Sequence, residues 1–171
     1  MTNKWLVSLL SVACIFSMDA YAGSHESVYK SKGTCSGRHS SITMMGQLPL
    51  QMAGEGQCVE EAQVMGNKEV RSGTCTYSII IDPSQQPPML QYTASCRNYG
   101  ADGNTLFLRF EDNVAITQLG GVAKGTVMGG TGKFKGASGA GTIKWGTGPM
   151  DPNDPMRNDN TYEVSVKLRI P

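Results

Sequence analysis

Few side chains in this sequence of 171 residues could transfer protons. The histidines are His25 and His39, so a triad of nucleophile, histidine and acid would need His39 as its base. His39 follows Gly37 and Arg38 in a predicted turn. The Gly-x-Ser-x-Gly turn that presents the nucleophile of many hydrolases is absent from the sequence. Hydrolase chemistry is therefore not expected.

Acidic residues occur as two adjacent pairs, Glu60–Glu61 and Glu111–Asp112. Neighbouring residues on a strand point to opposite faces, so neither pair can share one site. Glu60 or Glu61 could singly face the interior of a barrel, where burial would raise its pKa and allow it to move protons. The alternative for both is a solvated charge at the barrel rim.

Soft metal ligands are present, but they are not clustered. The methionines are scattered apart from Met44–Met45, with no Met-x-x-Met cluster that would favour Cu(I). No two cysteines have the Cys-x-x-Cys spacing of zinc knuckles, thioredoxin motifs or haem attachment sites. We therefore predict no metal and no cofactor, and we interpret the methionines as core residues that fill irregular space.

The first 22 residues have the pattern of a secretory signal peptide. Lys4 is followed by an apolar run over residues 5–16, and Ala20-Tyr21-Ala22 fits the small-x-small cleavage rule. Residues 23–171 are then expected to form a single domain in the periplasm or outside the cell. A lipoprotein anchored through Cys14 is the alternative, although Leu is the usual residue where Ser11 stands. No other stretch is apolar and long enough to cross a bilayer.

The charge balance and the cysteines narrow the class of protein further. Fifteen basic and 14 acidic residues give a formal charge of +1, so there is no basic excess to attract nucleic acid. Removal of Cys14 would leave four cysteines, and an even number in an exported chain indicates two disulfides. Four cysteines allow three pairings, so their number alone does not assign the partners.

Residues 74–81 and 90–96 form the best-supported predicted hairpin. Alternation places four residues of each run on one face, namely Cys75, Tyr77, Ile79 and Ile81, and Leu90, Tyr92, Ala94 and Cys96. If Ile81 opposes Leu90, both apolar faces align and Cys75 opposes Cys96. Opposed Cβ atoms lie about 4.5–5.5 Å apart, so a slight pinching of the strands allows a bond. We predict Cys75–Cys96, which leaves Cys35–Cys58.

Other strands are predicted at residues 28–35, 40–46, 57–65, 105–111, 114–119, 122–128, 140–145 and 160–171. Turns are expected at Ser36-Gly37, at residues 53–56, at residues 98–104 and at Asp112-Asn113. The last strand alternates most clearly, with Tyr162, Val164, Val166, Leu168 and Ile170 on one face. Left unpaired, this long strand would invite aggregation, so we expect it to pair with an early strand. About eight to ten antiparallel strands and no convincing helix predict an all-β barrel or sandwich, and this pairing favours a barrel.

Eleven of the 29 residues from Gly120 to Gly148 are glycine, interleaved with large apolar residues. This density predicts tight turns and bent strands, with a turn-rich connection over residues 129–139 and a short bent strand around residues 133–135. The spacing fits neither a phosphate loop nor a dinucleotide-binding fingerprint, because Phe134 follows Gly132-Lys133 and no helical period follows.

The segment GGTGKFKGASG at residues 129–139 resembles the glycine-rich segment of bacterial proteins with an allene oxide cyclase-like barrel, the fold shared with dirigent proteins. The turn at residues 99–104 before Thr105-Leu106-Phe107 also looks like the acidic Asp-Gly turn of such proteins. The resemblance covers roughly residues 73–146 and implies a small antiparallel barrel with an apolar interior. Plant members cyclise an unsaturated fatty-acid epoxide or direct phenoxy-radical coupling. No catalytic residue is carried over, because both matched motifs are turns.

From the residues and the resemblance together we expect an antiparallel barrel of about eight strands with two disulfides. We expect it to bind a small apolar molecule without catalysing a reaction. The predicted ligand-binding residues are Tyr77, Ile79, Tyr92, Phe110, Trp145 and Glu60. The alternatives are an enzyme of the cyclase, isomerase or dirigent type, and a disulfide-stapled structural or interaction protein with a filled interior. Many barrels of this class associate, so a homo-oligomer is also expected.

Overall fold

The computed structural model describes residues 25–148 and 151–171. The predicted signal peptide, residues 1–22, lies outside the described residues, and so does Cys14. Eight strands follow one another along these described residues: β1 (His25–Met45), β2 (Leu48–Val64), β3 (Asn67–Asp82), β4 (Met89–Gly100), β5 (Thr105–Ala115), β6 (Gly120–Gly130), β7 (Ser138–Thr147) and β8 (Arg157–Ile170). A single 3-10 turn, η1 (Gly132–Phe134), lies between β6 and β7.

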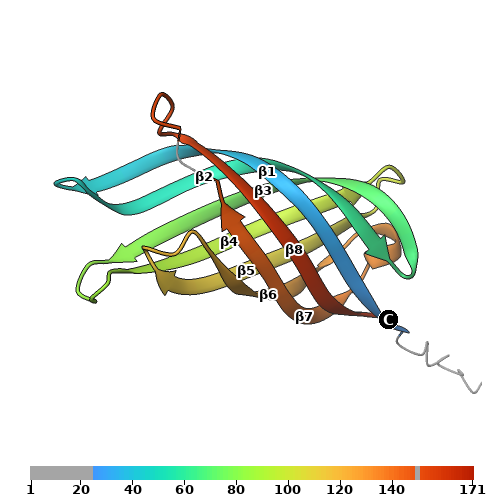
Figure 1. Cartoon of the computed structure of the whole chain (residues 1–171). Coiled ribbons are helices and arrows are strands. Elements are labelled where there is room, and N and C mark those ends of the chain that lie inside the picture. Colours follow the sequence, from blue (N-terminus) through green and yellow to red (C-terminus); the bar gives the residue numbers. More distant parts are fainter. Residues whose placement is uncertain (1–24, 149–150) are drawn as a thin grey trace, which may run out of the picture.

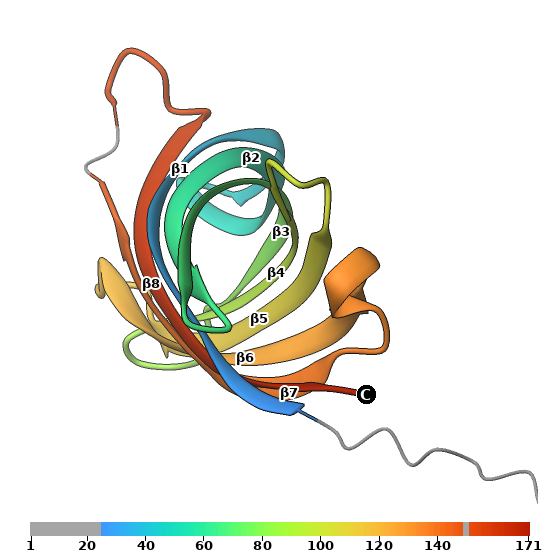
Figure 2. The same cartoon turned by 90° about the vertical axis from the view of Figure 1, so that its right-hand side faces the viewer.

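Each strand pairs antiparallel with the next, and β8 pairs with β1, so the sheet closes into a barrel. Figure 1 shows the strands from the side, and Figure 2 shows them as a ring around one interior. The predicted all-β barrel is therefore confirmed. Within the described part of the chain, no helix has the length and apolar character that a bilayer crossing requires.

The C-terminal strand closes the barrel and alternates as predicted. Its inward residues Tyr162, Val164, Val166 and Leu168 are buried, while the residues between them are exposed. β8 is paired on both sides, with β1 through Tyr29 opposite Val166 and with β7 through Ile143 opposite Val164. The long alternating strand therefore has no open edge along this pairing, as a stable barrel requires.

The β3–β4 hairpin has the predicted register. Ile81 opposes Leu90, Ile79 opposes Tyr92, Tyr77 opposes Ala94 and Cys75 opposes Cys96. Cys75 and Cys96 are joined by a disulfide, and a second disulfide joins Cys35 and Cys58 across β1 and β2. Both disulfides link residues directly opposite each other in neighbouring strands.

Two turns predicted in the first half are wrong. Ser36-Gly37 lies within β1, so the predicted strands at residues 28–35 and 40–46 are one long strand. Residues 53–56 lie within β2, which begins well before the predicted strand at residues 57–65. Gly37 opposes Gly56, and a Cβ at Gly37 would lie 2.8 Å from the backbone oxygen of Asn158. The glycines here allow close approach of neighbouring strands rather than a reversal of the chain.

The second half departs from the prediction at three places. Asp112 and Asn113 continue β5, and residues 116–119 form the connection to β6 rather than another strand. Asn98 belongs to β4 rather than to the following turn. The expected bent strand at residues 133–135 is instead η1, whose buried Phe134 packs into the barrel end.

One end of the barrel is filled by an arginine. Arg71 is buried, and its Nη2 donates to the backbone oxygens of Asn98 at 2.7 Å and Asn104 at 2.8 Å. Its Nη1 donates to Glu69 at 2.6 Å, and its guanidinium lies 5.1 Å from the ring centroid of Phe134. These contacts stabilise a charge that would otherwise destabilise the interior, although Arg71 Nε has no hydrogen-bond partner among the described residues.

Candidate functional site: a cavity at the other end of the barrel

The opposite end of the barrel contains a cavity of about 240 Å³. Its wall includes Tyr77, Ile79, Tyr92, Phe110 and Trp145, which are five of the six predicted ligand-binding residues. The mouth includes Leu119 from the β5–β6 connection and Pro155 from the β7–β8 connection. A concave, mainly apolar site with a few polar groups is typical of small-molecule binding sites.

Two aromatic side chains stack along one side of the cavity. The rings of Tyr92 and Trp145 lie 5.9 Å apart between centroids with an interplanar angle of 28°. The indole Nε1 of Trp145 donates to Asp112 Oδ2 at 2.7 Å, which holds the ring in place. Burial, and then the nearby Tyr77, raises the pKa of Tyr92 to about 12, so its hydroxyl stays protonated at neutral pH.

A histidine borders the cavity beside Tyr77. The rings of His39 and Tyr77 meet edge to face at 5.6 Å, and the Tyr77 hydroxyl lies 3.1 Å from His39 Nδ1. Burial lowers the pKa of His39 and raises the pKa of Tyr77, so both side chains are neutral near pH 7. His39 lies on β1, not in the predicted turn, and alternation from Cys35 places it on the inward face.

A buried carboxylate lies below the cavity floor. Glu60 has an exposed fraction of only 2%, while Glu61 is exposed. The four groups that donate to its carboxylate are the hydroxyls of Tyr29, Ser31 and Tyr162 and the amide nitrogen of Asn98. Ser31 and Asn98 lie at 2.8 and 2.7 Å, and Tyr162 at 3.0 Å. Four donors match the four lone-pair positions of a carboxylate, which stabilises this charge in the interior.

Glu60 does not itself line the cavity, but two of its partners do. Asn98 and Tyr162 form part of the cavity wall and connect it to the buried carboxylate. Burial, and then the charge of Glu60, raises the pKa of Tyr29 and of Tyr162. Their hydroxyls therefore stay protonated and donate to Glu60. Asn98 Oδ1 is buried without a hydrogen-bond partner among the described residues.

Two glycines make this arrangement possible. Gly33 on β1 stands opposite both Glu60 on β2 and Tyr162 on β8. A Cβ at Gly33 would lie 2.8 Å from the Tyr162 hydroxyl and 2.8 Å from Glu60 Cβ. Tyr162 therefore reaches Glu60 across a strand that carries no side chain there. Gly73 on β3 gives Asn98 the same room, because a Cβ at Gly73 would lie 2.7 Å from Asn98 Oδ1.

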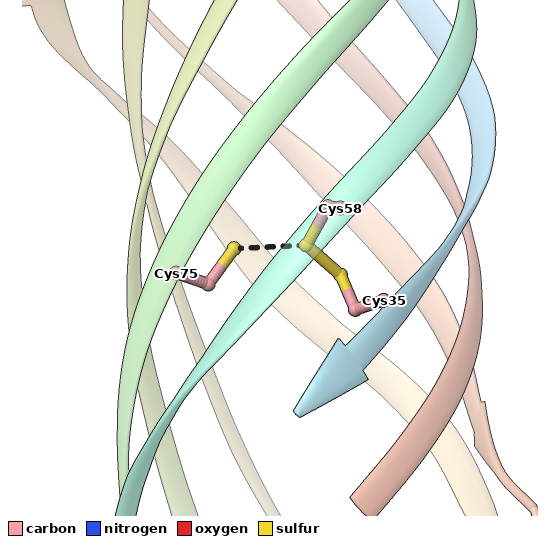
Figure 3. Close-up of side chains that lie close together, drawn as sticks. All are labelled: Cys35, Cys58 and Cys75. Carbon is pink, nitrogen blue, oxygen red and sulfur yellow. Dashed lines mark hydrogen bonds between the residues drawn. A yellow bond between two sulfur atoms is a disulfide. The ribbon is translucent and has the colours of Figure 1, made fainter. Parts of the chain in front are cut away.

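The disulfides form another part of the wall. Cys35, Cys75 and Cys96 line the cavity, and Cys58 is almost fully buried. Figure 3 shows the sulfur of Cys58 between those of Cys35 and Cys75. These three sulfur atoms lie within 4.8 Å of one another, but each is bonded in a disulfide and so is not available as a thiolate ligand for a metal.

Sequence reasoning placed His39 in a turn rather than in the interior, and it did not identify the four partners of Glu60. Alternation extended backwards from Cys35 places Tyr29 and Ser31 on the inward face, and alternation from Cys96 places Asn98 there. These signals were available, but the pairing of strands far apart in the chain was needed to bring the residues to Glu60.

Comparisons with known proteins agree with this architecture. No protein-family model matches the sequence, and no curated protein matches it. The structure is similar to that of the pterocarpan synthase dirigent protein GePTS1, with a TM-score of 0.50 and 14% sequence identity over 85% of this chain and 86% of that chain. The pterocarpan synthase dirigent protein PsPTS1 has a TM-score of 0.45 and 13% identity over 83% of this chain and 94% of that chain. At 14% identity the first likeness concerns the fold, and it confirms the predicted resemblance to dirigent-like barrels.

Proposed function

We propose that this chain, which has the barrel fold of dirigent proteins, binds one small and mainly apolar molecule in its cavity. The observation that carries the proposal is the cavity of about 240 Å³ with Tyr92 and Trp145 stacked in its wall. A structural protein with a packed interior, which the sequence left open, would be expected to fill this space with side chains.

The wall suggests the chemistry of the molecule. Aromatic faces favour a flat or ring-containing ligand, since ring pairs gain about 0.5–1.5 kcal/mol beyond the burial of apolar area. The floor offers Tyr162 and Asn98, whose positions are fixed by Glu60, to one polar group of the ligand. Ligand sites for drug-sized molecules span about 300–1,000 Å³. A cavity of about 240 Å³ therefore suits a smaller molecule.

Titration with the uncharged fluorophore N-phenyl-1-naphthylamine tests this proposal. We expect saturable binding with one site per chain, and about tenfold weaker binding in Tyr92→Ala because half of the aromatic stack is lost. Gln91→Ala is the matched control, because Gln91 is the preceding residue of β4 and is exposed. Equal binding by both variants would show that the fluorophore does not use the cavity and would count against the proposal.

Native mass spectrometry of protein purified from its host gives an independent test. We expect a co-purifying apolar molecule at one per chain, lost in Tyr92→Ala and retained in Gln91→Ala. Repeated absence of any bound molecule, together with no binding of the fluorophore, would contradict the proposal.

An enzyme acting on the same ligand is the second candidate, and His39 is the observation that favours it. Its neutral imidazole borders the cavity, and in the tautomer whose Nδ1–H donates to the Tyr77 hydroxyl, Nε2 keeps the lone pair that a general base needs. The bound molecules from wild-type protein and from His39→Ala can be compared by chromatography and fragmentation. Different molecules, including isomers of equal mass, would support an isomerase- or cyclase-type reaction. The same molecule in both would support binding alone.

We also propose that the protein is exported and self-associates. Two disulfides are consistent with an oxidising compartment outside the cytosol. Fractionation of the host should place the protein in the periplasm or medium, and light scattering should give a mass above that of one chain. Protein found in the cytosol would contradict export, and the mass of a single chain would contradict self-association.

A further inference from the structure

The two disulfides lie end to end on the inner face of four neighbouring strands. Cys58 Sγ and Cys75 Sγ, which belong to different disulfides, are 3.6 Å apart. Neither sulfur carries a hydrogen, so this approach, dashed in Figure 3, is a van der Waals contact rather than a hydrogen bond. The sulfurs therefore run in the order Cys35, Cys58, Cys75, Cys96 across β1 to β4.

Three of the four cysteines in this row line the cavity, namely the outer residues Cys35 and Cys96 and the inner residue Cys75. A small molecule in the cavity can therefore contact either outer residue. Cys58, the other inner residue, is 3% exposed and does not line the cavity. Attack from the cavity on an outer sulfur would release the inner partner as a thiolate that already touches the other disulfide.

We propose that this row of sulfurs is a site of thiol–disulfide exchange with low-molecular-weight thiols that enter the cavity. A thiolate attacks Cys35 Sγ, the Cys35–Cys58 bond breaks, and Cys58 leaves as a thiolate while Cys35 holds the incoming group. Cys58 then attacks Cys75 Sγ, a Cys58–Cys75 bond forms, and Cys96 leaves as a thiolate that takes up a proton. A second thiol molecule releases the first from Cys35 as a small disulfide. The net change is oxidation of two thiols and reduction of one protein disulfide.

Attack at the other end of the row leads to the same product. A thiolate on Cys96 releases Cys75, which attacks Cys58 and frees Cys35. Both routes converge on Cys58–Cys75 with Cys35 and Cys96 facing the cavity. The second step is intramolecular and begins at contact distance, which raises its rate greatly over the same reaction between separate molecules. Formation of the Cys58–Cys75 bond is therefore favoured over a reduction that leaves Cys58 and Cys75 both as free thiols.

Single-cysteine variants test the inner step without any added thiol. In Cys96→Ser the thiol of Cys75 is free and touches Cys58. We therefore expect it to displace Cys35, which gives a Cys58–Cys75 disulfide and a free Cys35. Because the two alternative disulfides are of similar type, about half of the molecules should rearrange. In the matched control Cys75→Ser the free thiol is the outer Cys96, and Cys35–Cys58 should stay intact. The protein is denatured in excess N-ethylmaleimide at mildly acidic pH, and peptide mapping then shows which cysteines were free and which were in a disulfide, including Cys14. Retention of Cys35–Cys58 in both variants would overturn the proposal.

Wild-type protein provides a second measurement should the variants fold poorly. The folded protein is treated with reduced glutathione, trapped with N-ethylmaleimide at intervals and mapped. We expect the species that has gained two electrons to carry Cys58–Cys75, with Cys35 and Cys96 either alkylated or bound to glutathione. A two-electron-reduced species that keeps either original disulfide would contradict the proposal, and so would resistance of both disulfides to glutathione in the folded state. Neither result depends on whether an apolar ligand binds.

Discussion

The hydroxyl of Tyr162 donates a hydrogen bond to Glu60 Oε2 at 3.0 Å, although the two residues are 102 positions apart. The contact crosses β1 at Gly33, which has no side chain to block it. Tyr162 also lines the cavity, so the buried carboxylate fixes the direction of a hydroxyl that a ligand can reach. The polar floor of the cavity thus depends on a charge that the ligand does not touch.

Glu60→Gln should destabilise the protein strongly. The amide would place an NH₂ donor where the partners of Glu60 also donate, leaving buried polar groups unsatisfied. We expect the free energy of unfolding to fall by about 3 kcal/mol, measured by denaturant titration. Glu61→Gln is the control, because Glu61 is exposed on the outer face and its replacement should change stability by less than about 0.5 kcal/mol. Equal effects of both substitutions would show that the network contributes no special stability.

Gly33→Ala should disturb the same network from its centre. The added methyl group would clash with the backbone oxygen of Val59, and it would lie 2.8 Å from the Tyr162 hydroxyl and from Glu60 Cβ, closer than contact distance. We expect a loss of about 1–3 kcal/mol in the free energy of unfolding, as for other overpacked interiors. Thr34→Ala, at the next and exposed position of β1, is the control. Unchanged stability in Gly33→Ala would mean that Tyr162 does not need to pass across Gly33.

Tyr92 should make the protein lose stability at alkaline pH. Burial raises the pKa of Tyr92 to about 12, while an unfolded tyrosine titrates near about 10. Between these values the unfolded state has lost the proton and the folded state keeps it, so stability falls as pH rises. One such proton gives a slope of about 1.4 kcal/mol per pH unit. Denaturant titrations from about pH 9 to about pH 12, a range that includes both the unfolded and the folded pKa, should therefore show a shallower slope in Tyr92→Phe. An unchanged slope would contradict the assigned shift.

Alternation was the most informative feature of the sequence. It predicted the face of β8 that is buried and the full β3–β4 register, because one register alone buries both apolar faces and brings Cys75 opposite Cys96. A shift of the pairing register by one residue would turn every side chain to the other face of the sheet, so an alternating pattern strongly specifies the register. The same rule extended along β1 would have placed His39 in the interior.

Local turn signals were less reliable, for a physical reason. Ser36-Gly37 and Asp112-Asn113 have turn-forming residues, yet both continue strands. Glycine marks a reversal of the chain and also a close approach of strands, and only the neighbouring strands show which applies. The partners of Glu60 were hidden for a related reason, because they come from β1, β4 and β8 and meet only when the barrel closes.

Filling the cavity tests its role most directly. Gly56 lines the cavity, and a Cβ there would lie 3.4 Å from Gly37 Cα, an ordinary contact that the fold can accept. Gly56→Leu therefore places a large apolar side chain in the cavity, while Gln57→Leu adds the same side chain on the exposed face of β2. N-phenyl-1-naphthylamine should bind wild type and Gln57→Leu alike and Gly56→Leu at least about tenfold more weakly. Equal binding by all three folded proteins would contradict a ligand site inside the barrel.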